Sequence, residues 1–450
     1  MARSRTTSTA TALAVALAIE GTLFAVLLRY TDVRAHGHAQ LLAVTAAPVW
    51  LLAVVLFARL QLTPRRAAVV VLGVSALLQL VALTSPPSSS DDDFRYVWDA
   101  KVQLAGIDPY RYPPSAPELA ELREPFLFGA PDHCAHPFPG GCTSINRPTV
   151  RTIYPPVAQA AFAGIRIASF GGRGGHLPLQ IAALFGCLAV GWLLLRRTKP
   201  WLAAVWAWCP VIVVEYANNA HIDWLAVLLV VLAVSARGVR AAGVLLGAAI
   251  AVKVYPALVL PALMRRSWIV AVAAIAFVVL VYVPHVIAVG DAVIGYLPGY
   301  LREEQYGSGN RLLLLGAMFP HPADTAAGAA LLLAVGLWAW RRGSIDAPAR
   351  SAVVVLGVAF LVFTPRYGWY AGVLLALVAL TGAVEWLPVV FAPTYAYVNH
   401  SHLDMPIYAV AALLTATIAA ARHPDNLRAW LRSISASTAR SRSSPSTPRR

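Results

Sequence analysis

Three consecutive carboxylates, Asp91, Asp92 and Asp93, are the residues of this chain best suited to chemistry. They come directly after an apolar segment, where charged groups are costly unless water, a cation or a substrate meets them. A carboxylate can serve as a general base, and a neighbouring carboxylate raises its pKa and so favours proton uptake. The same run could instead cap a surface helix, because acidic residues are favoured at helix N-termini. Spacing alone leaves both interpretations open.

Three further polar runs interrupt the apolar parts of the chain. The first run, with Asn219, His221 and Asp223, could bind a sugar or phosphate, or could cap a helix at the membrane interface. The second run contains Lys253, which is costly between apolar segments unless it meets an anion or extends to the interface. In the third run, Arg366 could clamp a phosphate beside rings that stack on a sugar, or could anchor an aromatic belt; the rings are Tyr367, Trp369 and Tyr370.

The composition indicates that membrane helices hold these residues. Of the 450 residues, 58% are hydrophobic and 13% are charged, whereas a soluble protein has roughly 25% charged residues. The net charge of +15 comes from arginines at the ends of apolar runs and in the C-terminal tail, as the positive-inside rule predicts. Without a soluble basic domain, nucleic-acid binding is not expected. We therefore expect an all-α polytopic protein embedded in a lipid bilayer.

The order of the apolar runs predicts a topology. They correspond to about 12 to 14 membrane segments, an even number that keeps both termini in the cytoplasm. Nearly every arginine cluster then lies inside, and the acidic and aromatic runs converge on the outer face. The predicted parts are N-terminal transmembrane helices over 1–84, an extracytoplasmic loop with interfacial helices over 85–175, a transmembrane bundle over 176–421 with a second outer loop at about 289–325, and a disordered basic cytoplasmic tail over 422–450.

The cysteines bear on the same topology. Cys134 and Cys142 lie eight residues apart in the long loop. If this loop is extracytoplasmic, a disulfide between them is favoured. A metal pair is the weaker interpretation, because no CxxC spacing occurs. Thirty-three arginines against three lysines, with abundant alanine, suggest a GC-rich bacterial genome.

The acidic run and the turn after it resemble the first outer loop of bacterial GT-C-type glycosyltransferases. Residues 91–99 read Asp-Asp-Asp-Phe-Arg-Tyr-Val-Trp-Asp, and residues 106–110 read Gly-Ile-Asp-Pro-Tyr. The chain is most similar to family 87 and its relatives among polyprenyl-phosphate-mannose-dependent mannosyltransferases. The runs at 152–156, 253–256 and 365–367 are also similar to this group, so the resemblance covers about residues 85–370.

The resemblance implies a GT-C-like bundle that transfers a sugar, mannose first, from a polyprenyl phosphate to a cell-envelope glycolipid or glycan. It implies Asp92 as the catalytic base, with Asp91 and Asp93 as alternatives, and inversion at the anomeric carbon. Because phosphate is a good leaving group, no strong general acid is needed; no cofactor is expected to be required, although a divalent cation could bind. The residues implied for donor phosphate are Arg95, Lys253 and Arg366, and those for sugar or acceptor are Tyr96, Asp99, Tyr110, Asn146, Arg151, Tyr154, Asn219, His221, Asp223 and Tyr367.

Two other classes of function fit the membrane scaffold. A secondary transporter or flippase for an organic anion or lipid-linked sugar would present similar polar residues at a vestibule. It would also predict internal symmetry between the two halves of the chain, and the loop 85–175 has no counterpart in the second half. A non-catalytic scaffold for envelope assembly would tolerate the loss of all three aspartates.

Overall fold

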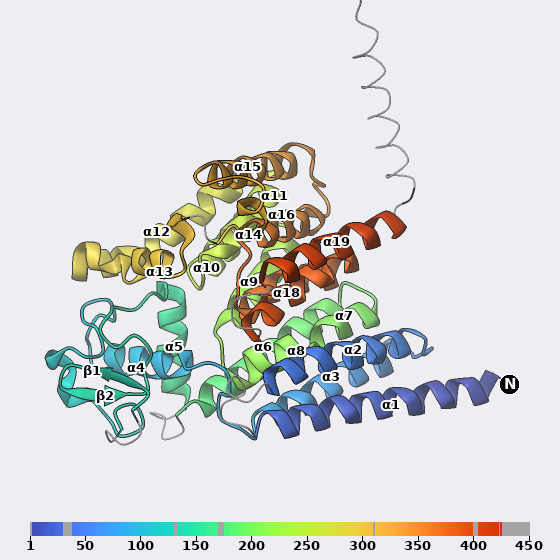
Figure 1. Ribbon diagram of the computed structural model, residues 1–450, viewed down its shortest axis with the longest axis horizontal. Helices are drawn as coiled ribbons and strands as arrows, with labels where there is room; N and C mark the ends of the chain where they lie inside the picture. The colour runs from blue at the N-terminus through green and yellow to red at the C-terminus, as the bar shows by residue number, and fades with distance from the viewer. Residues whose placement is uncertain are drawn as a thin grey trace, which may run out of the picture.

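The structure is a computed structural model and describes residues 2–29, 38–129, 134–169, 175–308, 311–398, 404–422 and 424. The predicted disordered tail therefore lies outside the described residues, apart from Arg422 and Pro424. Figure 1 shows a small lobe, drawn at the left, attached to one end of a long assembly of helices. The start of the first helix and the end of the last both lie at the end away from this lobe (Figure 1).

Apolar sequence forms most of the helices outside the lobe. Proline at a first helical position suits a helix start, because its missing N–H would have no helical partner there, and it starts α3, α7 and α16. The helices are α1 Ala2–Leu27, α2 His38–Ala58, α3 Pro64–Ala82, α6 Leu177–Leu195, α7 Pro200–Ala207, α8 Pro210–Ile212, α9 Asp223–Ser235, α10 Val239–Ile250, α11 Leu260–Met264, α12 Ile269–Val289, α13 Leu297–Glu303, α14 Leu313–Gly316, α15 Ala323–Arg342, α16 Pro348–Phe363, α17 Ala371–Thr381, α18 Leu387–Val398 and α19 Asp404–Arg422, with a π-helical segment at Val213–Asn218 and short 3-10 turns at Tyr255–Val259, Gly290–Ile294, Tyr306–Ser308, Gly368–Tyr370 and Val384–Trp386.

The all-α polytopic class is confirmed, but the number of full-length spans is lower than predicted. Among the described residues, six helices are long and apolar enough to cross a membrane, or seven if the pair Pro200–Ala207 and Pro210–Asn218, bent by 43°, counts as one span. The prediction of 12 to 14 also counted shorter apolar helices such as α9, α10 and α16, which fall in the 10–17 residue class. About 20 residues are needed to cross the hydrocarbon core without help.

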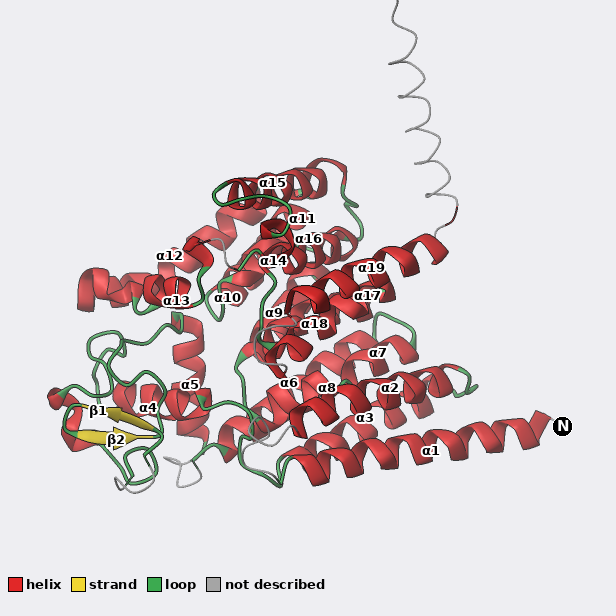
Figure 2. Cartoon of the chain, viewed as in Figure 1, coloured by secondary structure: helices red, strands yellow, loops and turns green. Residues whose placement is uncertain are grey.

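The lobe occupies the chain between α3 and α6 and has its own core. It contains α4 Asp92–Leu104, a 3-10 turn at Pro117–Leu122, strands β1 His136–Phe138 and β2 Gly141–Thr143, and α5 Pro156–Ala168. The two strands are antiparallel, with Pro137 opposite Cys142, and are the sheet drawn in Figure 2. Helices α4 and α5 pack through Tyr96 and Phe162, whose rings stack with centroids 4.4 Å apart.

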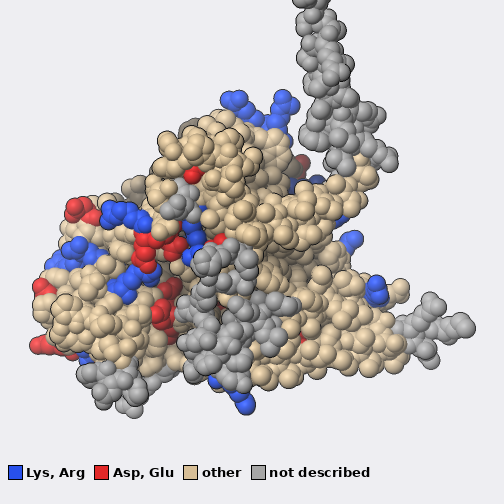
Figure 3. Space-filling model, in the orientation of Figure 1, with Lys and Arg blue, Asp and Glu red and all other residues tan. Residues whose placement is uncertain are grey.

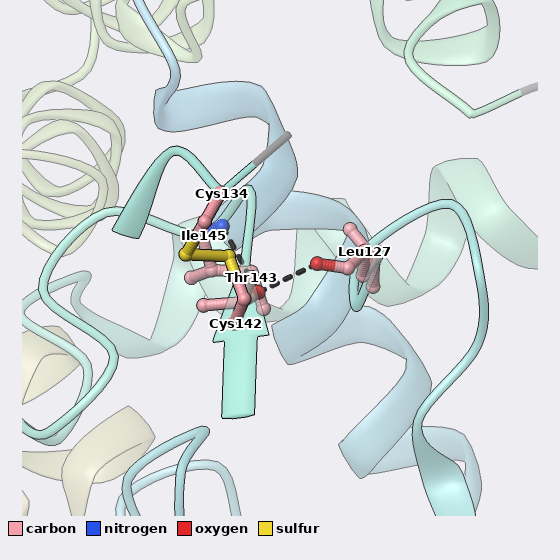
Figure 4. Close-up of a disulfide and its surroundings, with 5 residues drawn as sticks. All are labelled: Leu127, Cys134, Cys142, Thr143 and Ile145. Atoms are coloured by element: carbon pink, nitrogen blue, oxygen red, sulfur yellow. Dashed lines mark hydrogen bonds between the residues drawn. A yellow bond between two sulfur atoms is a disulfide. The ribbon is translucent and has the colours of Figure 1, made fainter. Parts of the chain in front are cut away.

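A disulfide between Cys134 and Cys142 closes the hairpin of the lobe, as Figure 4 shows. The next residue, Thr143, donates from Oγ1 to the carbonyl of Leu127 at 2.6 Å and accepts the backbone N–H of Ile145 at 3.1 Å. These bonds fix the direction of the chain as it leaves β2. The segment that they fix leads directly to Asn146, which reaches the acidic run.

Buried polar contacts attach the lobe to the helices. Ser88 Oγ donates to the Asn218 side chain at 2.7 Å, just before the acidic run. The Nδ1 atom of His285, on α12, lies 2.7 Å from Asp108 Oδ2. The backbone N–H of Val157, at the start of α5, donates at 2.9 Å to the carbonyl of Ala251, which ends α10. Three segments far apart in sequence thus hold the lobe in one position.

Candidate active site

The side chain of Asp92 lies where the lobe meets the helical assembly. Asp92 is the first residue of α4, so its carboxylate projects from the start of that helix. Asn146 Nδ2 donates to Oδ1 at 2.7 Å, and the Tyr154 hydroxyl donates to Oδ2 at 2.9 Å. The carboxylate is 18% exposed. It is therefore held in position from two segments of the lobe while remaining accessible.

The neighbouring aspartates have different surroundings, because successive residues at a helix start point in different directions. Asp91 lies at the rim, where its carboxylate meets His136 at 2.7 Å and accepts from Asn146 at 2.8 Å. Burial acts to raise the pKa of Asp91, but the hydrogen bonds from His136 and Asn146 outweigh it and lower that pKa. Asp93 is fully buried. Burial, and then the charges of Asp91 and Asp92, raise the pKa of Asp93 well above its usual value.

His221 lies behind Asp92, between two carboxylates. Its Nδ1 is 3.7 Å from Asp92 Oδ2, and its Nε2 is 3.6 Å from Glu215 Oε2. The imidazole stacks on the Trp369 ring with centroids 4.0 Å apart and is fully buried. The imidazole thus connects the catalytic candidate to a second buried acid without reaching the surface.

Lys253 supplies positive charge close to Asp92. Its ammonium lies 3.1 Å from Asp223 Oδ2 and 5.4 Å from the ring centroids of both Tyr154 and Tyr370. Cations are attracted to the faces of aromatic rings at this range. Tyr154 therefore contacts the lysine with its ring and the Asp92 carboxylate with its hydroxyl. We call Asp92, Tyr154, His221, Lys253 and Trp369 the junction site.

The second outer loop and the run after α16 border the junction site. The Tyr367 ring stacks on Trp369 with centroids 4.5 Å apart, and its hydroxyl donates to Glu304 at 2.6 Å. The hydroxyls of Tyr300 and Tyr370 are 3.0 Å apart. Figure 3 shows acidic and basic side chains gathered on the face where the lobe meets the helices above it. Aromatic rings and charged groups thus line one region, an arrangement that suits a sugar carrying a phosphate.

The four polar runs singled out in the sequence therefore meet, although not every candidate residue faces the junction site. Arg95 and Asp99 are the first correction. They form a buried pair at 3.0 Å, and Arg95 also donates to the Val150 carbonyl at 3.1 Å. Asp99 accepts from Thr152 at 2.6 Å. Both side chains are nearly fully buried and satisfied within the lobe, so neither is placed to bind a donor phosphate or an acceptor.

Tyr96, Tyr110 and Asn219 are also structural rather than exposed to a ligand. Tyr96 is fully buried against Phe162. The Tyr110 hydroxyl donates to the Tyr154 carbonyl at 2.7 Å, so it positions that residue from behind. The fully buried Asn219 amide accepts the backbone N–H groups of the serines before the acidic run, at 3.1 and 3.2 Å. Tyr110 and Asn219 each satisfy a buried backbone group, whereas the Tyr96 hydroxyl lies 3.5 Å from His221 Nδ1 and supports the junction site from behind.

The remaining candidates lie at the edges. Arg366 pairs with Asp404, at the start of α19, and is 39% exposed. Arg151 is exposed and donates to the carbonyl of Arg111 at 3.1 Å. No group of three His, Cys, Asp or Glu side chains that could hold a metal ion is found in the part of the chain that the structure describes. The expectation that no cofactor is required, with a divalent cation as a possible ligand, stays a prediction.

Sequence reasoning missed three residues near the junction site. Glu215 belongs to the polar run before α9 but gave no signal apart from its charge. Trp369, by contrast, is one of the rings that the sequence predicts could stack on a sugar, with an aromatic belt as the alternative. Arg147 and Glu303 lie 156 residues apart and form an ion pair between the lobe and α13. Only a co-varying pair of positions, which one sequence cannot display, would have connected them.

Fold and site define an α-helical polytopic membrane protein whose acidic and aromatic site lies between a small lobe and the helical assembly. The sequence model of glycosyltransferase family 87 matches residues 152–365. The match confirms the resemblance to a GT-C-type glycosyltransferase of family 87, over slightly less than half of the 450 residues. The chain is thus a membrane glycosyltransferase. No curated protein and no solved structure was found to match it.

The matched segment covers only part of the junction site. It contains Tyr154, His221 and Lys253 and begins after the acidic run. The role of Asp92 therefore depends on its geometry and not on the family match.

Proposed function

We propose that the protein transfers a sugar, mannose in the first instance, from a polyprenyl-phosphate carrier to a glycolipid or glycan acceptor of the cell envelope. The observation that carries this proposal is the junction site itself. One tyrosine, Tyr154, contacts both an accessible carboxylate and a cation. Its hydroxyl donates to Asp92, and its ring faces Lys253. A base for an acceptor hydroxyl and a cation for a departing phosphate are the two groups that this reaction needs.

Asp92 is the proposed catalytic base. Each carboxylate oxygen has two lone-pair directions, so the bonds from Asn146 and Tyr154 leave one on each oxygen for an acceptor hydroxyl. Asp93 is fully buried, and Asp91 is committed to His136 at 2.7 Å. These surroundings favour Asp92 over its neighbours.

The proposed reaction is a direct displacement. The acceptor O–H gives its proton to Asp92 while its oxygen forms a bond to the anomeric carbon. The bond from that carbon to the phosphate oxygen breaks, and the lipid phosphate leaves with the electron pair. Lys253 stabilises the charge that develops on the phosphate, and Arg366, which is partly exposed, is a second candidate for this role. Attack opposite the leaving group inverts the anomeric centre.

We place the site on the extracytoplasmic face of a bacterial cytoplasmic membrane, with both termini in the cytoplasm. The start of α1 and the end of α19 lie at the end of the molecule away from the lobe (Figure 1). Arg59 follows α2, and Arg65 and Arg66 lie in the first turn of α3, as expected at the cytoplasmic ends of two helices. The disulfide of the lobe fits an oxidising compartment.

The test is sugar transfer by the purified full-length protein in lipid vesicles. Radiolabelled polyprenyl-phosphate-mannose is supplied with an extract of bacterial envelope lipids, and the lipid-linked product is isolated. We expect label in the lipid fraction and the opposite anomeric configuration from the donor by NMR. Retained configuration would contradict direct displacement. Absence of transfer from mannose and arabinose donors alike, with protein shown to be folded, would contradict the proposed donor class.

A further inference from the structure

We propose that Arg147 binds the phosphate of the donor, and that Glu303 occupies this position on Arg147 in the substrate-free protein. The inference rests on the proposed function, because it assigns the phosphate subsite of the same junction site. It adds a third cation to Lys253 and Arg366, the candidates named above for the leaving phosphate, and it replaces Arg95, which is buried in the lobe.

The contact between Arg147 and Glu303 has the form of an arginine bound to an oxyanion. Arg147 Nε lies 2.9 Å from Glu303 Oε2 and 3.2 Å from Oε1, while Nη2 also donates to Oε1. Two parallel N–H···O bonds from one guanidinium are the geometry with which arginine binds carboxylate and phosphate alike. The hydrogen bond from Arg147 is the main cause that lowers the pKa of Glu303. The carboxylate is therefore an ionised oxyanion on the face of the guanidinium.

Arg147 is close to the reacting groups. It follows Asn146, whose amide donates to the Asp92 carboxylate at 2.7 Å. Its positive charge interacts with Asp92 and with Tyr367, which stacks on Trp369. A phosphate on this guanidinium would thus lie one residue along the chain from the amide that holds the proposed base.

The backbone of Arg147 also indicates a specific task. Its φ is +46°, a left-handed conformation that few residues other than glycine adopt and that is concentrated at functional sites. From this position the side chain reaches Glu303, the last residue of α13.

The partner carboxylate can leave. Arg147 and Glu303 are 36% and 41% exposed, and exposed ion pairs contribute little to stability. Tyr296 donates to Glu303 at 2.9 Å from the same segment, so it would move with it. Gly290 and Gly295 have φ of +62° and +59° and bound the turn that precedes α13. The donor phosphate is a diester with one negative charge, so it competes with Glu303 on equal terms and gains a second charge as the lipid monophosphate leaves; this gain would complete the displacement of Glu303, and α13 would separate from the lobe.

The experiment measures binding of a polyprenyl monophosphate without a sugar, so that it does not depend on transfer. The full-length protein in detergent is titrated by thermal shift and by ligand-induced tryptophan fluorescence. Glu303→Gln weakens the competitor, and we expect about threefold to fivefold tighter binding. Arg147→Gln removes the bidentate donor, and we expect binding at least about tenfold weaker. Arg302→Gln, an exposed arginine next to Glu303, is the matched control and should bind as wild type does.

A charge exchange separates phosphate binding from a purely structural pair. The double variant Arg147→Glu with Glu303→Arg restores an ion pair between the lobe and α13 and should keep the wild-type melting temperature. We expect it to bind polyprenyl phosphate as weakly as Arg147→Gln. The proposal would be overturned if the exchanged protein binds as wild type does, or if binding is unchanged in Glu303→Gln. It would equally be overturned if Arg302→Gln loses as much affinity as Arg147→Gln, or if the wild-type protein does not bind the probe.

Inorganic phosphate in the same titration distinguishes the source of the ligand. If both probes bind and both depend on Arg147, the phosphate group alone is recognised. If only the lipid probe binds, the whole lipid carrier is recognised. Either result supports the inference. Sugar transfer by wild type together with binding that ignores Arg147 would refute this inference and leave the proposed function intact. Arg147-dependent binding without transfer from any donor would refute the proposed function alone.

Discussion

Replacement of Arg95 by methionine should destabilise the lobe and leave donor recognition intact. Arg95 and Asp99 are 5% and 3% exposed and lie 3.0 Å apart. Removing one partner of a buried ion pair leaves an uncompensated charge and costs about 3–5 kcal/mol. Asp99 retains hydrogen bonds from Thr152 at 2.6 Å and Gln159 at 2.8 Å. We therefore expect a loss near the lower limit, about 3 kcal/mol.

The assay is thermal unfolding of the full-length protein in detergent, followed by donor kinetics at a temperature where every variant is folded. Arg95→Met should lower the melting temperature by several degrees, whereas Arg65→Gln, an exposed arginine in the first turn of α3, should not change it. The KM for the donor should be the same in Arg95→Met as in wild type. An unchanged melting temperature with a KM raised tenfold would refute this reasoning and return Arg95 to the phosphate site.

Three further predictions concern the lobe and the cation requirement. Cys134→Ser with Cys142→Ser, or reduction with dithiothreitol, should lower the stability of the lobe by about 2–3 kcal/mol, measured as a lower melting temperature; an unchanged melting temperature would contradict a stabilising disulfide. Because the pKa of Asp93 is raised in the folded protein, the contribution of Asp93 to stability should decline as pH rises above about 4, the pKa of an unperturbed aspartate. Asp93→Asn should flatten that decline in melting temperature, and an identical profile would contradict the burial of an acid at this position. Treatment with EDTA should leave sugar transfer unchanged, since Lys253 and arginine supply the positive charge, and abolition that Mg²⁺ reverses would show a required cation.

Much of the architecture could be predicted because it depends on composition. Long apolar stretches such as Leu177–Leu195 can satisfy their backbone only as helices in a bilayer, so the class followed directly. The number of full-length spans did not follow. In the apolar run 241–264, which contains Lys253 and Pro256, α10 ends at Ile250 and a 3-10 turn begins at Tyr255. The position at which such a run breaks depends on its tertiary contacts, and a hydropathy profile gives no information about them.

The site could be predicted as a set of runs but not as individual contacts. Carboxylates and a lysine are costly in apolar surroundings, which singled out Asp92 and Lys253. Tyr96 and Arg95 lie in the same run yet face inward, because α4 presents one side to the core of the lobe. The pair of Arg147 and Glu303 depends on two loops meeting in space, and periodicity gives no information about that.

Sugar transfer by Asp92→Asn, compared with Asp91→Asn and wild type, tests the central claim most directly. The amide keeps the size of the side chain but cannot accept the acceptor proton, and general bases contribute about 10²- to 10⁴-fold to rate. We expect a loss of that size in kcat for Asp92→Asn, with the wild-type melting temperature and donor binding retained, and a loss below about tenfold for Asp91→Asn. Transfer by folded Asp92→Asn at the wild-type rate would contradict the assignment of Asp92 as the base.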